Sequence, residues 1–192
     1  FTYAFQNKYF VEGNFGYNGS ERFAKEQRFG FFPTIGAAWY VSKEPFWEGN
    51  LQRIVSNLKL RGTYGLVGND AIGSLDDRFF YLSEINPNVS AAGYTFGSEF
   101  GNRINGVTEG RLENRDITWE TSQKLNLSAE VGLFNMANLI VDLYKEHRYN
   151  ILMTRAHTPN TMGVAVLPQA NVGEAESKGI DVSLEASKNF SN

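Results

Sequence analysis

The sequence predicts an all-β chain of antiparallel strands with the dimensions of a transmembrane β-barrel. Three observations indicate this. Apolar and polar residues alternate over six segments, as in strands that have one apolar and one polar face. Each segment spans about ten residues, the length of a strand tilted across a bilayer. Short and long connections alternate along the chain, as periplasmic turns and extracellular loops do in outer-membrane barrels.

The apolar side chains of each segment fall at every second position and therefore share one face of a strand. The segments cover residues 9–17, 29–39, 58–66, 125–133, 139–143 and 180–186, and residues 1–5 also resemble a strand. Residues 50–56 are the only helix candidate, short enough to cap a turn.

The opposite faces carry charges near the middle of the segments: Glu12, Lys59, Arg61, Lys124, Glu130, Asp142, Asp181 and Glu185. An unpaired charge in a dry core would cost roughly several kcal/mol, whereas a water-filled lumen hydrates it. These faces would also be hydrated on the outside of a soluble sandwich. Alternation therefore leaves both folds open, and strand length and loop asymmetry favour the barrel.

The connections have two sizes. Tight turns are expected at residues 7–8 and 134–138 and a medium one at 42–57, whereas long connections are expected at 19–28, 68–116 and 149–174. A connection of this length without regular structure argues against a compact soluble domain and is typical of external loops. Four aromatic residues lie near segment ends, where their rings favour the lipid–water interfaces: Tyr9, Tyr17, Trp39 and Trp119.

The bulk composition excludes several classes of protein. The net charge of −3 gives no basic footprint for nucleic acid, and the absence of cysteine excludes disulfides and thiolate metal sites. No apolar run approaches the roughly 18–20 residues of a membrane helix. Both ends resemble interior sequence, so we expect residues 1–192 to be a piece of a longer polypeptide.

Five runs of residues, in order and at fitting spacing, resemble the barrel of SusC/RagA-like TonB-dependent outer-membrane transporters. They read NKYFVEGNFGYNGSERFAKEQRFGFFPTIGAAWYVSKEPF, LKLRGTYGLVGN, ITWETSQKLNLSAEVGLF, VDLYKEHRYNIL and NVGEAESKGIDVSL. Asn18 and Glu21 stand where the family usually has Asp and Ser. The resemblance is weakest over residues 71–115.

This resemblance implies a plugged barrel of about 22 strands in the outer membrane of a Bacteroidetes-type bacterium. Such transporters import oligosaccharides or peptides, are energised by TonB through the plug, and carry a SusD-like surface lipoprotein as a lid. Residues 1–192 would then form a partial barrel of six to seven strands with a long extracellular loop at about 68–116. The plug would lie outside this chain, and the rest of the barrel and outer-membrane lipid would surround it.

Aromatic residues in that loop are the candidate contacts with substrate or lid: Phe79, Phe80, Tyr81, Tyr94, Phe96 and Phe100. Aromatic rings stack on sugar faces and fill protein interfaces. The competing interpretation, which we favour, is that the long loop packs against itself.

No catalytic, metal or cofactor constellation is evident. His147 and His157 lack a third convergent ligand, and the loop carboxylates Asp76, Asp77, Glu84 and Glu99 have no fixed spacing. The sequence therefore predicts transport and no enzyme. Two alternatives stay open: a siderophore- or cobalamin-type receptor of the same barrel class without a lipoprotein lid, and a soluble carbohydrate-binding β-sandwich.

Overall fold

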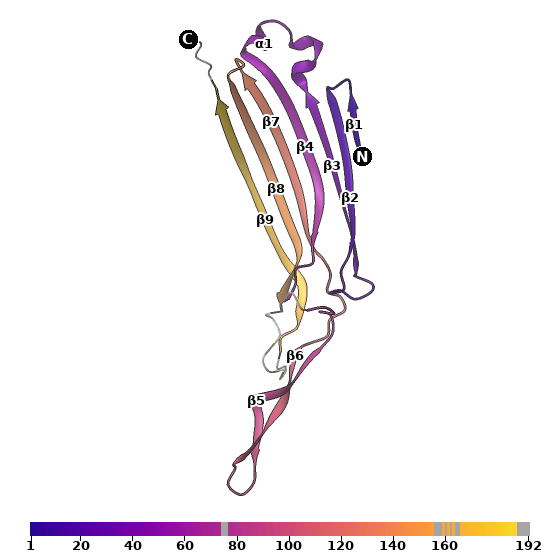
Figure 1. Ribbon diagram of the computed structural model, residues 1–192, viewed down its shortest axis with the longest axis vertical. Coiled ribbons are helices and arrows are strands. Elements are labelled where there is room, and N and C mark those ends of the chain that lie inside the picture. Colours follow the sequence, from indigo (N-terminus) through magenta and orange to yellow (C-terminus); the bar gives the residue numbers. More distant parts are fainter. Residues whose placement is uncertain (74–76, 156–158, 160, 162, 164–165, 188–192) are drawn as a thin grey trace.

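The structure is a computed structural model and describes residues 1–73, 77–155, 159, 161, 163 and 166–187. Seven strands form one antiparallel sheet in the order β1-β2-β3-β4-β7-β8-β9, and a separate hairpin pairs β5 with β6 (Figure 1). The sheet strands are β1 (Thr2–Phe5), β2 (Tyr9–Gly19), β3 (Phe29–Tyr40), β4 (Val55–Asn69), β7 (Glu120–Leu133), β8 (Ala137–Thr154) and β9 (Gln169–Ala186). The hairpin strands are β5 (Glu84–Phe96) and β6 (Asn102–Arg111).

The register carries the alternation from strand to strand. One row of directly paired residues crosses five neighbouring strands and is apolar throughout: Tyr9, Trp39, Leu60, Ala129 and Val141. The row beside it points to the other face and contains Ala38, Arg61, Ser128 and Asp142. Because side chains alternate with a period of two, this alignment gives the whole sheet an apolar face and a polar face. All six predicted strands, and the strand at the N-terminus, are confirmed.

Short connections gather at one end of the sheet, called the turn end below (Figure 1). In the β1–β2 turn Gln6 and Asn7 have φ of 52° and 53°, and in the β7–β8 turn Phe134 and Asn135 have φ of 52° and 54°. Two consecutive left-handed residues are the backbone of a type I′ turn, which suits the twist of paired strands. The predicted helix is confirmed as α1 (Asn50–Ile54), which follows η1 (Val41–Lys43) and η2 (Pro45–Trp47).

The opposite end of the sheet, the loop end, carries the long connections, and the β5–β6 hairpin projects beyond it (Figure 1). The sequence predicted a long loop without regular structure between residues 68 and 116, and the hairpin corrects that prediction. Its pattern was hidden because Pro87 and a run of small residues interrupt β5 and three register shifts displace the pairing.

Neither face of the sheet is covered by a second layer within the described residues. Leu60 and Tyr64 are 40% and 43% exposed on the apolar face, where a soluble sandwich would bury them. Buried apolar residues cluster instead at the loop end: Phe23, Ile72, Phe80, Ile117 and Trp119, packed against Phe32 and Leu152. We call this cluster the loop hub. The exposure of the sheet contradicts the sandwich alternative.

In the part of the chain that the structure describes, no helix is both long and apolar enough to cross a membrane.

Candidate functional site

The apolar face is an exposed hydrophobic surface that extends over several strands. Its exposed side chains include Val11, Phe15, Tyr17, Phe29, Phe31, Ile35, Leu60, Leu127, Leu143, Ile180, Val182 and Leu184. A soluble monomer seldom exposes so large a continuous apolar area, and such an area marks contact with protein or lipid.

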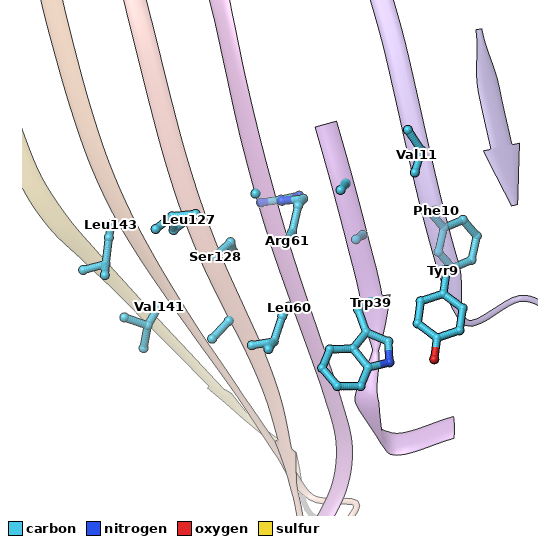
Figure 2. Close-up of a pocket in the computed structure, with 14 residues that line it drawn as sticks. Tyr9, Phe10, Val11, Trp39, Leu60, Arg61, Leu127, Ser128, Val141 and Leu143 are labelled. Carbon is cyan, nitrogen blue, oxygen red and sulfur yellow. The ribbon is translucent and has the colours of Figure 1, made fainter. Parts of the chain in front are cut away.

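Small residues hollow the middle of this face. Ala37, Gly62 and Ala129 lie between larger neighbours and leave a depression of about 550 Å³. Figure 2 shows Tyr9, Trp39, Leu60, Val141 and Leu143 around it, arriving from neighbouring strands. Its lining is almost entirely apolar, so it offers dispersion contacts and no chemistry.

The apolar face ends at different levels on different strands. On β8 and β9 it gives way to Lys145 and Lys178, which pair with each other. On β3 apolar residues continue to Phe29, several rows farther toward the loop end. A horizontal boundary between lipid and water cuts tilted strands at such staggered positions, so the stagger fits strands tilted across a bilayer.

The polar face carries ion pairs that cross the strands. Arg61 of β4 lies 3.5 Å from Asp142 of β8, spanning β7 between them. Lys59 lies over the Tyr40 ring at 5.0 Å. The side chains of Arg61 and Asp142 are 51% and 24% exposed, so this pair adds only about 0–1 kcal/mol to stability. A polar surface of this kind can exchange its partners with water or with a passing solute.

A second group of charges on the polar face lies nearer the loop end. The Glu146 carboxylate accepts hydrogen bonds from Ser122 at 2.6 Å and from Arg148 at 3.0 Å, and Lys124 lies 4.0 Å away. Arg148 also lies 3.5 Å from Glu120. Each charge of this group has an opposite partner, so the group is strongly hydrophilic without a large net charge.

The loop hub ties three long connections to the end of the sheet. Phe23 comes from the β2–β3 connection, Ile72 and Phe80 precede the hairpin, and Ile117 and Trp119 follow it. Phe23 is fully buried, and its ring lies 5.3 Å from that of Trp119. The hub therefore holds segments that are distant in sequence in one arrangement.

Hydrogen bonds to backbone groups reinforce the hub. Arg22 donates to the carbonyl oxygens of Asp70 and Ile72 at 2.8 and 3.1 Å, and the Trp119 indole donates to Arg28 O at 3.2 Å. Trp119 was expected from the sequence at a lipid–water interface, and that expectation was wrong. Its ring is 8% exposed because it fills the space between the loops and Phe32.

Arg111 fixes the root of the hairpin to the hub. Its guanidinium lies 4.3 Å from the centre of the Phe80 ring, 3.3 Å from the Asp77 carboxylate and 4.0 Å from the Glu84 carboxylate. Its Nε donates to Leu82 O at 3.2 Å. A guanidinium suits this position because its planar fork stacks on a ring and binds several oxygens at once.

At the turn end, one carboxylate gathers several donors. Glu44 accepts hydrogen bonds from Tyr9 at 2.5 Å, from Trp39 at 3.1 Å and from Lys8 at 3.3 Å. These donors, the Tyr9 hydroxyl foremost, hold the pKa of the Glu44 carboxyl below its usual range. The Tyr9 and Trp39 rings stack at 6.2 Å. Two amphipathic rings are thus fixed where the apolar face meets the turns.

The structure separates the six aromatic residues that the sequence analysis singled out. Phe80 is 4% exposed in the loop hub, as expected for a loop that packs against itself. Phe79 is half-exposed beside Tyr81. The other three lie on the distal hairpin and are exposed: Tyr94, Phe96 and Phe100. They do not form one site, and contact with substrate or lid stays a prediction for the exposed members.

The other candidate groups do not converge. His147 lies on β8, 3.5 Å from Glu174, and His157 and Asp76 fall outside the described residues. No group of three or more metal-ligating side chains is found among the residues that the structure describes. Sequence reasoning missed Phe23 and Ile117 as hub residues. The signal available for Phe23 was its place in the Arg22-Phe23 match with the transporter family.

Comparison with known proteins identifies relatives that agree with this geometry. Residues 2–191 match the sequence model of the family described as TonB dependent receptor-like, beta-barrel. TonB-dependent receptor P26 of Formosa agariphila is 32% identical over 184 residues, which are 95% of this chain and 17% of that protein. TonB-dependent receptor SusC of Bacteroides thetaiotaomicron is 28% identical over 186 residues, 96% of this chain and 18% of that protein.

Solved structures show the same fold. The RagAB peptide importer in its closed-closed state matches with a TM-score of 0.76 at 21% identity, covering 99% of this chain and 19% of the other. Its open-open state matches with a TM-score of 0.75. This chain therefore spans less than a fifth of the length of the proteins that it resembles.

Proposed function

The chain belongs to the family of TonB-dependent receptor-like β-barrels, and we propose that it forms part of the barrel wall of an outer-membrane importer of oligosaccharides or peptides. It would act by transport without catalysis, with TonB acting through a plug and with a SusD-like surface lipoprotein as lid. Residues 1–192 contribute strands of the barrel wall and external loops to this transporter.

One observation carries the proposal: the sheet exposes an apolar face and an ion-paired polar face and has no second layer among the described residues. In a barrel, lipid covers the apolar face and a wet lumen hydrates the polar face. The turn end then faces the periplasm, and the loop hub holds the external loops at the mouth of the barrel.

The exposed aromatic residues of the distal hairpin are an argument for the proposed lipoprotein partner. An isolated two-stranded hairpin is at best marginally stable in water. This one nevertheless exposes Tyr94, Phe96, Phe100 and Ile104, which a partner lying over the barrel would cover. The Tyr94 and Phe96 rings pack edge to face at 5.4 Å and form a ready anchor of the kind that dominates protein interfaces.

Uptake by intact cells tests the import. Cells that produce the complete protein should accumulate a fluorescent oligosaccharide or peptide, and a protonophore should stop the accumulation because TonB draws on the proton-motive force. Accumulation that continues without the protein, or that ignores the protonophore, would overturn the proposal. Uptake restricted to iron chelates or cobalamin, with no lipoprotein copurifying, would establish the siderophore-type alternative.

The hairpin variant Y94A/F100A tests the lid contact in the same complete protein. We expect roughly a tenfold loss or more in affinity for the copurified lipoprotein, because exposed aromatic anchors carry much of an interface's energy. The matched control is F46A, since Phe46 is equally exposed but lies at the turn end. Unchanged affinity in Y94A/F100A would rule out this contact.

A further inference from the structure

Two lysines lie side by side where the apolar face ends on β8 and β9. Leu143 of β8 pairs with Ile180 of β9, and one row nearer the loop end Lys145 pairs with Lys178. Like charges directly opposite each other destabilise a sheet. The limit of the apolar face therefore holds two ammonium groups together, and an anionic group placed between them would relieve their repulsion.

Carboxylates follow the lysines on the side away from the apolar residues. His147 pairs with Glu176 in the next row, and the Lys145 ammonium lies 3.0 Å from the Glu176 carboxylate. The Glu174 carboxylate lies 3.5 Å from His147 Nε2. The side chains of Lys145 and Glu176 are 53% and 48% exposed, so their ion pair is weak and can exchange its partners with a bound group. Outward from the apolar residues, the face thus presents ammonium groups first and carboxylates second.

A cavity of about 260 Å³ lies at this border and is lined by Lys145 and Glu176. Tyr64 lines it too, and its hydroxyl accepts a hydrogen bond from the Gln123 amide. This fixes an amphipathic ring of the kind that favours a lipid–water interface. Leu143, one row nearer the turn end than Lys145, lines the larger apolar depression. The charged cavity and the depression therefore follow one another on one face and suit the head and the acyl chain of a single molecule.

The order of these charges matches one kind of lipid headgroup. A phosphoethanolamine headgroup carries its phosphate next to the acyl chains and its ammonium group farther out. Consecutive rows on one face of a strand lie about 6.6 Å apart, so a phosphate level with the lysines places the ammonium group near the carboxylates. A purely anionic headgroup would satisfy the lysines but bring no cation to Glu174 and Glu176.

We propose that Lys145 and Lys178 bind the phosphate, and Glu174 and Glu176 the ammonium group, of a phosphoethanolamine lipid. Its acyl chain lies along the apolar face toward the depression. Charge-assisted hydrogen bonds at both ends of the headgroup give the site its selectivity. This inference rests on the proposed barrel wall, in which lipid covers the apolar face, and it names the lipid that this part of the wall prefers.

The test uses the complete protein, purified in detergent, freed of native lipid and titrated with lipids that have the same acyl chains. Phosphatidylethanolamine carries both charges of the headgroup, whereas phosphatidylglycerol carries the phosphate alone. Soluble phosphoethanolamine carries both charges but no acyl chain. Native mass spectrometry counts the lipid molecules that each protein retains, and wild type should prefer phosphatidylethanolamine to phosphatidylglycerol by about tenfold.

Two double variants separate the two ends of the headgroup. K145Q/K178Q should bind phosphatidylethanolamine at least about tenfold more weakly than wild type, because it loses the charged donors to the phosphate. E174Q/E176Q should bind phosphatidylethanolamine no better than phosphatidylglycerol, because it loses the acceptors for the ammonium group. The melting temperature of lipid-free K145Q/K178Q should not fall, because this variant removes two like charges that oppose each other.

The matched control is K59Q/K124Q, which removes two lysines from the polar face of β4 and β7 and should bind lipid as wild type does. Equal binding of phosphatidylethanolamine by wild type and K145Q/K178Q overturns the site, and so does equal binding of the two lipids by wild type. Competition by soluble phosphoethanolamine as strong as that by the lipid overturns a lipid as the occupant.

Uptake by wild-type cells keeps this inference distinct from the import function. Accumulation of substrate by cells whose purified transporter shows no headgroup preference is a failure of the lipid site alone. Absence of accumulation with the headgroup preference intact is a failure of the import function alone.

Discussion

Phe15 and Phe23 are both phenylalanines, but one is exposed and the other is buried. Comparing variants of the two tests the loop hub directly. Phe23 is fully buried, whereas Phe15 is 74% exposed on the apolar face. F23A should destabilise the hub by about 3–5 kcal/mol, the usual cost of deleting a buried phenylalanine ring. Faster amide exchange and faster proteolysis in the loops at residues 20–28, 70–73 and 77–83 would measure this loss.

F15A serves as the control for this prediction. The loops should exchange as in wild type, because the Phe15 ring contacts Phe31 on the apolar face and none of the hub residues. Equal loop exchange in F23A and wild type would show that the hub does not hold the loops.

Glu44 makes the turn end sensitive to acid. Hydrogen bonds from Tyr9, Trp39 and Lys8 keep the pKa of its carboxyl lowered. A carboxyl with a lowered pKa stabilises the fold above its ordinary titration range, and that stabilisation is lost as the pH falls below about 4.3 and on through the lowered pKa. The unfolding temperature should therefore drop between pH 6 and the acid range by more in wild type than in E44Q. Parallel pH profiles for the two proteins would contradict the prediction.

The sequence could predict which residues alternate but not which distant residues meet. Tyr9, Trp39 and Leu60 were assigned to apolar faces because a period of two is a local signal. Trp119 was misplaced because its partners Phe23 and Phe32 lie about 90 residues away in the chain, and nothing local marks that contact. The candidate site was predicted only in part: Phe80 proved to be a buried hub residue, and Ile117 was not recognised as one.

At the scale of single elements, strand ends depend on glycines that admit a neighbouring ring. A Cβ added at Gly68 of β4 would overlap the Phe32 ring, which itself packs on Trp119. G68A should therefore displace Phe32 and loosen the loop end, seen as a changed tryptophan fluorescence and faster exchange of β4 amides beyond residue 65. The displacement follows from sterics alone, since the Gly68 backbone is ordinary extended strand.

Gly13 of β2 supplies the matched control. A Cβ there meets nothing within 4 Å, so G13A should leave the fluorescence unchanged and slightly favour the strand. Identical behaviour of the two variants would mean that Phe32 moves without effect on the hub.

Among the elements, the seven sheet strands were predictable and the hairpin was not. Each strand of the sheet has one apolar and one polar face, so apolar residues recur at every second position of its sequence. The β5–β6 hairpin has no such contrast, because both of its sides are exposed and its bulges shift the alternation. Its aromatic residues were recognised as a group, but their division between hub and distal hairpin depends on tertiary packing.

At the scale of the whole molecule, the sheet has the features of a barrel wall with lipid on one side and water on the other. Its apolar face exposes aromatic and aliphatic side chains, its polar face carries ion pairs that cross strands, and its two ends differ in the length of their connections. None of these features stabilises an isolated sheet in water. All of them suit a barrel whose outside meets lipid and whose inside holds water.

The most direct test of this account measures what each face of β7 touches. Residues 1–192 contain no cysteine. With any cysteine elsewhere in the complete protein replaced by serine, single spin-labelled cysteines can be placed one at a time along the strand in the protein reconstituted in lipid. Oxygen, which concentrates in lipid, should relax labels at positions 125, 127 and 129, and a water-soluble nickel chelate should relax labels at positions 126, 128 and 130. Nickel access to both sets alike, or no access of either reagent to the first set, would contradict the account.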